Sequence, residues 1–461
     1  MSKPTVVLGV APTKRGFLSM EEAKRQKDKF MAVVRAVKPG FVKIVDIDDI
    51  CENGILFETD KISSVVEKFK DARIDALFLP HCDFGEEQCA AGVAAALKAP
   101  TLVWGPRDER PNTPQSRGRD TQCGMFACTK VLRRFGVAYS YIWNCETESE
   151  DFRQGFENFI RVAAVVKTVK NLRVAKFGAR PQPFMSVMAN EGDLASRLGV
   201  TVIPISPNAA AARADQLQKE ASEAYQACRE DLRARFDASG TPEETVDRIA
   251  ALKLAVKRLM EENRCTAGAM ECWSAASIFG APVCAVLGEL ADLGLPLACE
   301  TDVNGAVTMA MLQAAALGEE AVFLADLTIR HPQNDNAELL WHCGPFPYSL
   351  KDPASAASLA EGQERFALKK GPITLCRFDE AGGEYYLFGG EGRAVDGPKT
   401  TGTYVWFEAD NWKRWEEKLM FGPYIHHIGG VYGNYKPVLR EAARYLGLIF
   451  DDADQQGIYS L

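Results

Sequence analysis

The stretch Ala298-Cys299-Glu300-Thr301-Asp302-Val303-Asn304-Gly305-Ala306-Val307-Thr308 joins an apolar run to an apolar helical pattern and places two carboxylates at the junction. We expect Asp302 to cap a helix through Val303–Ala316, because an aspartate oxygen accepts from the first free backbone N–H groups. On an extended strand Glu300 and Asp302 would share one face. Buried acids are costly unless something neutralises them, and a divalent metal does so well. The segment therefore predicts a strand, a helix and a metal site between them.

A third carboxylate and a pair of imidazoles lie in other unusual places. Glu271 follows the apolar segment Ala267–Met270, in a stretch that carries no other charge. We interpret it as a functional acid; the plainer alternatives are an exposed loop acid or the partner of a buried arginine. His426 and His427 lie in a glycine-rich loop that an apolar core would not need. At least one of them is expected to have a functional role.

Histidine is scarce, with five in the chain, so position is informative. His342 ends an apolar run and is a further candidate, whereas His81 and His331 are interpreted as loop or strand-end residues. Hard oxygen ligands with an imidazole suit Mn²⁺, with Mg²⁺ as the alternative, better than Zn²⁺. Such a site can polarise a carbonyl and its neighbouring hydroxyl while a carboxylate moves the proton between them. The residues thus predict interconversion of an aldose and a ketose through an enediol.

Composition limits the classes of partner and compartment. The chain has 461 residues, which favours two or three domains, and its net charge of −8 argues against nucleic acid or an anionic membrane as partner. The apolar run Val6–Val10 is too short to span a membrane, and no signal pattern precedes it. Thirteen cysteines without a CxxC pair favour reduced thiols in a cytoplasmic protein over disulfides, with a catalytic thiol as the alternative.

The first domain is expected over residues 1–170, where short apolar runs alternate with amphipathic stretches. This alternation favours a doubly wound parallel sheet, and no GxGxxG follows the first run to suggest a dinucleotide. The expected strands are Val6–Val10, Phe41–Val45, Ala76–Phe78, Thr101–Trp104 and Ala138–Trp143. The expected helices are Met20–Val37, Lys61–Asp71, Glu86–Leu97 and Thr121–Phe135.

Two further domains are expected. Residues 171–318 read as a second doubly wound α/β domain, which carries the metal-site carboxylates. Residues 319–461 contain Gly-rich turns between short Tyr-, Phe- and Val-rich runs, which is typical of an antiparallel, barrel-like β domain. This third domain supplies the late histidines. The predicted fold class is therefore α/β, with two parallel-sheet domains followed by a β-rich domain.

The order of these motifs resembles the L-fucose/L-arabinose isomerase family. The resemblance rests on Glu271, Cys299–Ala306, Trp341–Gly344 and His426–Gly430, and it extends over most of the chain. It implies an aldose–ketose isomerase with Mn²⁺ bound by a glutamate, an aspartate and a histidine, in which the two acids also move the proton between C1 and C2.

Carried over by position, the resemblance assigns the metal to Glu271, Asp302 and His427, with Glu271 and Asp302 as the catalytic acids. In the arabinose branch a Glu-Gly-Asp-Trp motif supplies a glutamate that matches Glu300 instead. His342 resembles the additional histidine of that branch, and His426 is the neighbouring alternative to His427. The fucose and arabinose branches of the family differ in which acid binds the metal, and this sequence has features of both branches. The tryptophan of these motifs is Val303 here.

The resemblance also implies substrate-binding residues and an oligomer. Lys14-Arg15-Gly16 resembles an N-terminal turn that reaches a neighbouring subunit's site, and Trp104 resembles a substrate-stacking tryptophan, although it could equally be a core residue. Asn304 belongs to the metal motif. The family forms homo-oligomers, commonly trimers or hexamers, with sites near subunit interfaces. Arg15, Arg107 and Arg180 follow strand-like runs and could bind an anionic hexose such as sulfoquinovose, although surface ion pairs are the plainer reading.

Two other classes of function stay open from the sequence. A sugar-binding protein of the same fold would need no metal, and its sugar affinity would not respond to a chelator. A metal-dependent lyase or aldolase would use a similar site but would release two fragments from one substrate.

Overall fold

The computed structural model describes residues 5–111, 113 and 118–457. The chain divides into two compact units, residues 2–167 (unit 2) and residue 1 with 168–461 (unit 1). The expected second and third domains, 171–318 and 319–461, lie together in unit 1, where one hydrophobic core draws residues from both. In the described part of the chain no helix has the length and apolar character needed to cross a membrane.

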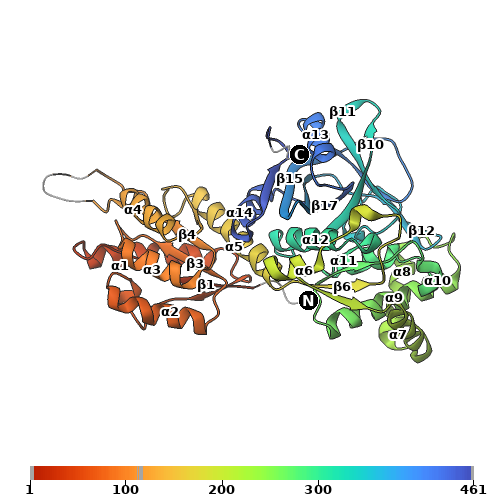
Figure 1. Cartoon of the computed structure of the whole chain (residues 1–461), viewed down its shortest axis with the longest axis horizontal. Coiled ribbons are helices and arrows are strands. Elements are labelled where there is room, and N and C mark those ends of the chain that lie inside the picture. Colours follow the sequence, from red (N-terminus) through yellow and green to blue (C-terminus); the bar gives the residue numbers. More distant parts are fainter. Residues whose placement is uncertain (1–4, 112, 114–117, 458–461) are drawn as a thin grey trace. The chain divides into compact units, whose positions relative to one another are not determined.

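Unit 2 is built on a five-stranded parallel sheet of order β2-β1-β3-β4-β5 (Figure 1). Fully buried strands such as β3 (Ala76–Pro80) carry continuous apolar runs, as parallel sheets covered on both faces require. The other strands are β1 (Val6–Val10), β2 (Val42–Val45), β4 (Thr101–Trp104) and β5 (Tyr139–Tyr141). The helices are α1 (Met20–Ala36), α2 (Ile62–Asp71), α3 (Glu87–Leu97), α4 (Thr121–Arg134) and α5 (Glu150–Lys170). Every strand and helix expected in this region is present.

Unit 1 begins with a four-stranded parallel sheet of order β7-β6-β8-β9. Its strands are β6 (Arg173–Phe177), β7 (Thr201–Ile205), β8 (Ala267–Met270) and β9 (Leu297–Ala298). Its helices are α6 (Glu191–Asp193), α7 (Pro207–Glu220), α8 (Glu223–Arg235), α9 (Glu243–Glu262), α10 (Ala275–Phe279), α11 (Cys284–Asp292) and α12 (Val303–Ala315). The carboxyl ends of β6, β8 and β9 share one edge of the sheet, where ligands of open α/β sheets bind.

The rest of unit 1 is a nine-stranded, mostly antiparallel sheet of order β12-β13-β16-β11-β10-β17-β14-β15-β18. Pairing of β15 with β16 closes the six central strands into a barrel. The strands are β10 (Val322–His331), β11 (Asn334–His342), β12 (Ser358–Ala360), β13 (Gln363–Ala367), β14 (Pro372–Ala381), β15 (Glu384–Val395), β16 (Thr403–Glu408), β17 (His427–Tyr432) and β18 (Ile449–Asp452). Two helices complete the unit, α13 (Trp412–Phe421) and α14 (Lys436–Leu446).

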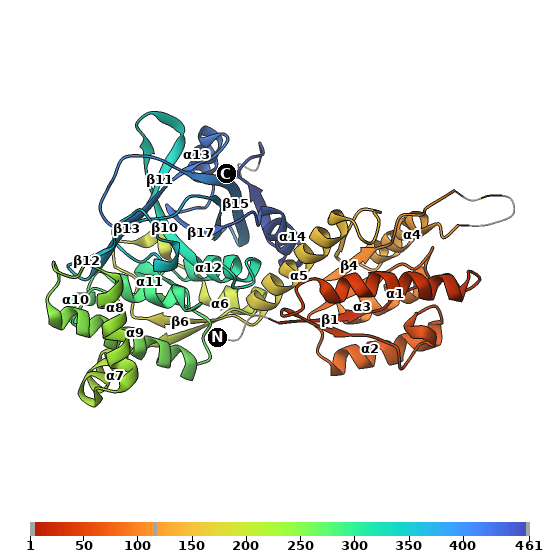
Figure 2. The same cartoon turned by 180° about the vertical axis from the view of Figure 1, so that it is seen from behind.

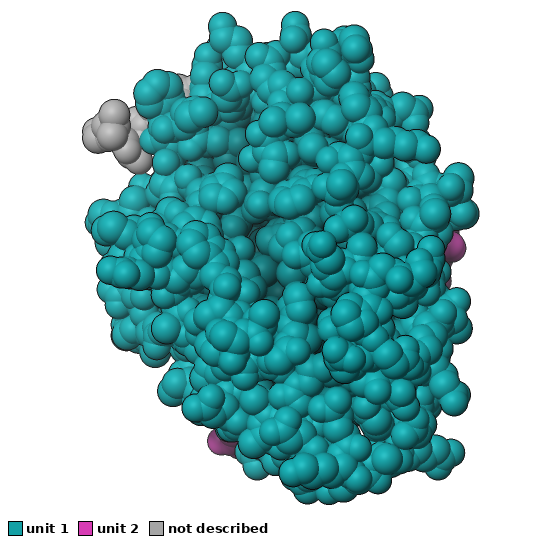
Figure 3. Space-filling view, turned by 90° about the vertical axis from the view of Figure 1, so that its right-hand side faces the viewer, with its two compact units in different colours: residues 1, 168–461 teal, residues 2–167 magenta. Residues whose placement is uncertain are grey.

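Helix α12 joins the parallel sheet to the barrel. It contacts β8 and β9 on one side and β10, β14 and β17 on the other, and both views show it between the two sheets (Figures 1 and 2). A helix packed between two sheets must be apolar nearly all round, which explains the run Ala306–Met311. The predicted fold class, two parallel-sheet regions and a barrel-like β region, is confirmed. The space-filling view shows one face of unit 1, which is hollowed near its middle (Figure 3).

Candidate metal centre and active site

Four strand ends or strand positions of unit 1 bring acids and imidazoles to one place. Glu300 follows β9, Asp326 lies in β10, His342 ends β11 and His427 begins β17. In the barrel ladder Asp326 is the direct partner of His427 on one side and of Trp341, the residue before His342, on the other. The register of β10 with its two neighbours therefore fixes three of the four groups relative to one another.

The backbone after β9 aims Glu300 into this cluster. The strand ends at Ala298, and Glu300 and Thr301 both have left-handed backbone conformations, with φ of 49° and 61°. Such a conformation costs a β-branched residue roughly 1–3 kcal/mol, so it persists only when the surroundings enforce it. The Thr301 hydroxyl donates to the Ala179 carbonyl over 3.0 Å and holds the turn. The expectation that Glu300 and Asp302 share one strand face is therefore wrong, because the segment is not extended.

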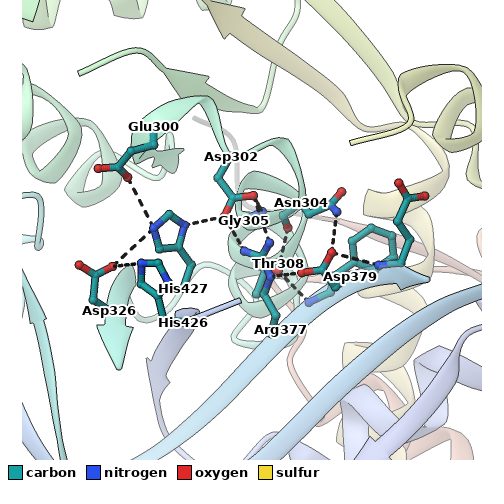
Figure 4. Close-up of polar contacts among 12 residues, drawn as sticks. Glu300, Asp302, Asn304, Gly305, Thr308, Asp326, Arg377, Asp379, His426 and His427 are labelled. Carbon is teal, nitrogen blue, oxygen red and sulfur yellow. Dashed lines mark hydrogen bonds and ion pairs between the residues drawn. The ribbon is translucent and has the colours of Figure 1, made fainter. Parts of the chain in front are cut away.

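The two acids instead lie on opposite sides of the His427 ring (Figure 4). Asp302 Oδ2 is 2.8 Å from His427 Nδ1, whereas Glu300 Oε2 is 3.6 Å from Nε2. Asp326 Oδ1 lies 3.5 Å from the same Nε2. His342 Nε2 completes the group at 3.8 Å from Glu300 Oε2 and 4.0 Å from Asp326 Oδ1.

These four side chains fit a divalent cation. Within the part of the chain that the structure describes, Glu300 Oε2, Asp326 Oδ1 and His342 Nε2 are buried without a hydrogen-bond partner. A six-coordinate cation with ligand distances of about 2.1 Å separates its ligand atoms by about 3.0 Å when adjacent and about 4.2 Å when opposite. The observed separations of 3.5 to 4.0 Å fall within this interval. Two carboxylates with two imidazoles form a donor set suited to Mn²⁺, Mg²⁺ or a related divalent ion.

The electrostatics around His342 favour positive charge at this position. Burial alone would lower the pKa of His342, but its neighbour Cys343 and the carboxylates of Asp326 and Glu300 raise it to about 9. His342 Nδ1 lies 3.2 Å from the Cys343 sulfur, to which it donates when protonated, and Nε2 faces the two acids. The thiols of Cys284 and Cys299, together with His342, hold the pKa of the Cys343 thiol below its usual range despite burial. The surrounding field therefore suits a cation.

Asp302 belongs to a buried network behind this cluster. It caps α12, since Gly305 N donates to its Oδ1 over 2.8 Å. The guanidinium of Arg377 binds both of its oxygens, at 2.5 and 3.2 Å, and also reaches Asp379 at 2.9 Å. Asp302 and Arg377 are fully buried. Both Asp302 oxygens are therefore occupied, and the remaining contact of this carboxylate is with His427 Nδ1.

Charge pairing determines how this network ionises. Burial opposes the charge on Asp302, but Arg377 and His427 outweigh it and hold the pKa of this carboxyl well below its usual range. The same pairing raises the pKa of Arg377 against its own burial. Asp379 is different, because burial dominates and raises its pKa. Asp302 is thus the ionised partner that orients His427, in the manner of a carboxylate–histidine–metal triad.

Glu271 lies at the same edge of the parallel sheet, directly after β8. Its Oε2 accepts from the Ala179 N–H over 3.2 Å, and its Oε1 accepts from the Ser274 hydroxyl. It is half-buried and belongs to none of the metal-ligating groups found among the described residues. The next residue, Cys272, donates its thiol to Glu300 Oε1 over 3.4 Å. Glu271 therefore lies beside the cluster of Glu300, Asp326, His342 and His427 and is not one of its members.

An aromatic wall borders the cluster. The Phe184 ring stacks on Trp273 at 5.9 Å and on His426 at 5.7 Å, and meets His427 edge-on at 5.4 Å. His426 Nε2 is 3.9 Å from Asp326 Oδ1, but the residue is exposed, unlike His427. Trp273 is 62% exposed, which leaves a large apolar surface beside the candidate metal ligands. Such surfaces suit the apolar face of a sugar ring.

The other expected substrate residues have varied positions. Trp104 is fully buried in unit 2, where its ring packs against Phe30 and Phe152. Arg15 pairs with Glu86 and Glu87 and lies over the Phe84 ring. Arg107 is exposed in unit 2.

Two expected substrate residues lie in unit 1. Arg180 lies after β6, on the edge that carries Glu271, and donates to the carbonyls of Pro181 and Gln182. Asn304 is buried and donates to Asp379 over 3.0 Å.

Sequence reasoning missed three residues of this region. Asp326 ends the buried run Val322–Ala325, which is the pattern that drew attention to Glu271. Arg377 and Asp379 are oppositely charged residues two apart in the mostly buried strand β14, so they point to one face. This pair of opposite charges was therefore the available signal.

Comparisons with known proteins agree with this architecture. A family model described as fucose/sulfoquinovose isomerase, N-terminal domain, matches residues 9–170, and one described as L-fucose isomerase, C-terminal domain, matches residues 354–453. A sulfoquinovose isomerase of Priestia megaterium is 26% identical over 414 residues, which cover 87% of this chain and 90% of that protein. Another from Alkalicoccus urumqiensis is 28% identical over 338 residues, covering 70% of this chain and 73% of that protein.

Among solved structures, a solute-binding protein of Bacillus halodurans with bound myo-inositol aligns at 13% identity, covering 68% of this chain and 90% of that one. Its TM-score of 0.17 carries no information about this fold. The two family models together cover more than half of the chain, and the long alignments to the curated relatives span both units. The chain belongs to the fucose/sulfoquinovose isomerase family.

Proposed function

We propose that this aldose–ketose isomerase acts on an anionic 6-substituted hexose of the sulfoquinovose type and depends on a divalent cation held by Glu300, Asp326, His342 and His427. The observation that carries the metal proposal is the convergence of three buried, unpartnered ligand atoms around His427 Nε2. The substrate class is supported by the relatives, which are named sulfoquinovose isomerases.

When bound, a divalent cation polarises the substrate carbonyl and its neighbouring hydroxyl and makes the proton at C2 easier to remove. We assign the movement of that proton to Glu271. Its carboxylate is half-buried, is held by Ala179 N and Ser274 Oγ, and lies next to the residue that contacts Glu300. A carboxylate held by two donors can take a proton from one carbon and return it to the next.

Asp302 takes a positioning role in this proposal. The guanidinium of Arg377 stabilises the charge of the Asp302 carboxylate. The contact of Asp302 with Nδ1 of His427 orients Nε2 of that ring toward Glu300 and Asp326. Trp273 and Phe184 offer an apolar surface to the sugar ring. Arg180, on the same sheet edge as Glu271, is the arginine of unit 1 that we assign to the anionic group.

The test is a panel of aldoses assayed with Mn²⁺, with Mg²⁺ and with EDTA, in which products are identified. Sulfoquinovose is compared with glucose, which has the same ring and no sulfonate, and with glucose 6-phosphate. We expect a single ketose from sulfoquinovose, at least tenfold higher kcat/KM than from glucose, and no turnover in EDTA. Two fragments would indicate a lyase, and turnover that persists in EDTA would refute the metal dependence.

Arg180→Gln tests the anion contact within the same panel. We expect the KM for sulfoquinovose to rise about tenfold, equivalent to about 1.4 kcal/mol, with little change for glucose. Arg197→Gln in the same unit is the matched control. Mn²⁺ as the native ion, a trimer or hexamer, a role of Arg15, Arg107 and Trp104 at a neighbouring site and a cytoplasmic location stay predictions.

A further inference from the structure

A row of four cysteines runs along the metal centre, and the isomerase mechanism uses none of them. Cys272 follows β8, Cys299 follows β9, Cys343 follows β11 and Cys284 begins α11. All four are free thiols. They come from four different segments of the fold, so their meeting reflects the tertiary structure rather than a local motif.

The row is continuous. The sulfurs of Cys284 and Cys343 are 3.3 Å apart, and Cys299 interacts with the thiols of both Cys343 and Cys272. Cys272 in turn donates to Glu300 Oε1 over 3.4 Å. Cys272, Cys299 and Glu300 form a group whose ligand atoms all lie within 4.8 Å of one another. The row of thiols thus ends beside Glu300 Oε1, the carboxylate oxygen that does not face the imidazoles.

The two carboxylate oxygens of Glu300 face different groups. Its Oε2 faces His342 and His427, at 3.8 and 3.6 Å, whereas its Oε1 faces the Cys272 thiol. Glu300 Oε2 has no hydrogen-bond partner among the described residues, and the residue is 8% exposed. The left-handed backbone at Glu300 and Thr301 keeps the carboxylate between the imidazoles and the thiols.

We propose that Cys272, Cys299 and Glu300 Oε1 form a second cation site that takes a thiophilic divalent cation of the zinc class. Thiolate ligands select such ions over Mn²⁺ and Mg²⁺, which prefer oxygen donors. A tetrahedral site with Zn–S of about 2.3 Å and Zn–O of about 2.1 Å separates sulfur from oxygen by about 3.6 Å. The observed 3.4 Å between Cys272 and Glu300 is close to this edge.

Access to the site is through its less buried member. Cys272 is partly exposed, and the neighbouring Trp273 is mostly exposed, whereas Cys299 is buried. A cation can therefore enter from the side of Cys272. Since Glu300 would serve both sites, a cation bound by the thiols fixes one carboxylate oxygen and limits how freely the other can meet the imidazoles. The proposal does not require the isomerase activity.

The test is a Cd²⁺ titration of the whole, reduced, metal-free protein, kept in a non-thiol reductant, with ultraviolet absorbance as the readout. Cadmium bound by thiolates gives a charge-transfer band, whereas cadmium bound by carboxylates and imidazoles does not. We expect one equivalent of band-forming Cd²⁺. Cys272→Ser and Cys299→Ser should each weaken this binding at least tenfold.

Cys123→Ser is the matched control, because Cys123 is an exposed thiol in α4 of unit 2. We expect it to leave the band and the affinity unchanged. Cys272 is partly exposed, so Cys272→Ser decides the matter if Cys299→Ser fails to fold by circular dichroism. The proposal is overturned if the wild type shows no band, if Cys272→Ser retains the full band and affinity, or if Cys123→Ser loses as much. Because the readout is optical, an inactive protein that forms the band would contradict the proposed function alone.

Discussion

Replacing Asp302 with asparagine separates a metal ligand from a residue that positions one. Asparagine keeps the shape of the side chain and can still cap α12 through Gly305 N. It removes the charge that neutralises Arg377, which is fully buried and then retains only Asp379. It also replaces the carboxylate that accepts from His427 Nδ1.

The magnitude follows from these contacts. Removing one partner of a buried ion pair costs about 3–5 kcal/mol, because the other charge stays buried. Loss of an orienting partner of a metal-bound histidine weakens metal affinity by about 10- to 100-fold. We therefore expect Asp302→Asn to lose about 3–5 kcal/mol of unfolding free energy in EDTA and to bind Mn²⁺ about 10- to 100-fold more weakly, without losing the site.

Glu300→Gln is the matched comparison at the neighbouring acid. Glu300 pairs with no arginine among the described residues, and its Oε2 approaches the same His427 Nε2 as Asp326 does. Removal of its charge should therefore cost less than 1 kcal/mol in the metal-free protein. Mn²⁺ binding should instead fall by more than 100-fold, because a direct ligand is lost.

Urea unfolding in EDTA measures the first quantity for both variants, and the free Mn²⁺ signal in electron paramagnetic resonance measures the second. If Asp302→Asn unfolds at the urea concentration of the wild type and binds no Mn²⁺, Asp302 is a ligand and the positioning role is wrong. The same conclusion follows if Glu300→Gln retains wild-type Mn²⁺ affinity.

Three further outcomes are expected. Trp273→Ala should raise the KM for the sugar about threefold to tenfold, equivalent to roughly 0.5–1.5 kcal/mol of lost aromatic contact. The unfolding free energy should not change, because the ring is exposed. An unchanged KM in steady-state assays would exclude the stacking role. Thr301→Gly should keep the unfolding free energy within about 1 kcal/mol of the wild type, because relief of the φ of 61° offsets the lost hydrogen bond to Ala179. Thr301→Val keeps the strained backbone and loses the hydrogen bond, so it should be clearly less stable than the wild type in urea. Burial, with help from Glu416, raises the pKa of Glu338 from 4.5 to about 7, so this residue's contribution to stability is present below pH 4.5 and is lost as pH rises to 7. Glu338→Gln should therefore be more stable than the wild type at pH 8, by up to about 3 kcal/mol, and equal to it near pH 4.5; equal urea midpoints at pH 8 would contradict the shift.

The sequence was sufficient for the elements whose signal is local. Strands β1, β3 and β4 of unit 2 are mainly apolar runs, and β1 and β4 have the predicted bounds. Helix α12 was predictable from its Asp302 cap and its unbroken apolar pattern. Closure of the barrel was not predictable in detail, because the pairing of β15 with β16 depends on contacts between strands that no local pattern encodes.

The candidate site was predictable in its chemistry and less so in its geometry. Glu300, His342 and His427 come together, although Glu300 and His342 had been alternatives. Asp326 was missed because a single acid at the end of a strand is a common feature, and only its register opposite His427 gives it meaning. Spacing in the sequence does not contain that register.

The choice between Glu300 and Asp302 shows most clearly where inference from spacing ends. Two acids separated by one residue share a face only on an extended strand, and here two consecutive left-handed residues turn the chain instead. The turn sends one carboxylate to Nε2 of His427 and the other to Nδ1 of the same ring. One imidazole thus stands between an acid that faces the cation site and an acid neutralised by Arg377. The backbone strain at Glu300 and Thr301 is what permits two neighbouring acids to differ in this way, and a chain that relaxed to an extended strand there would lose the division of roles.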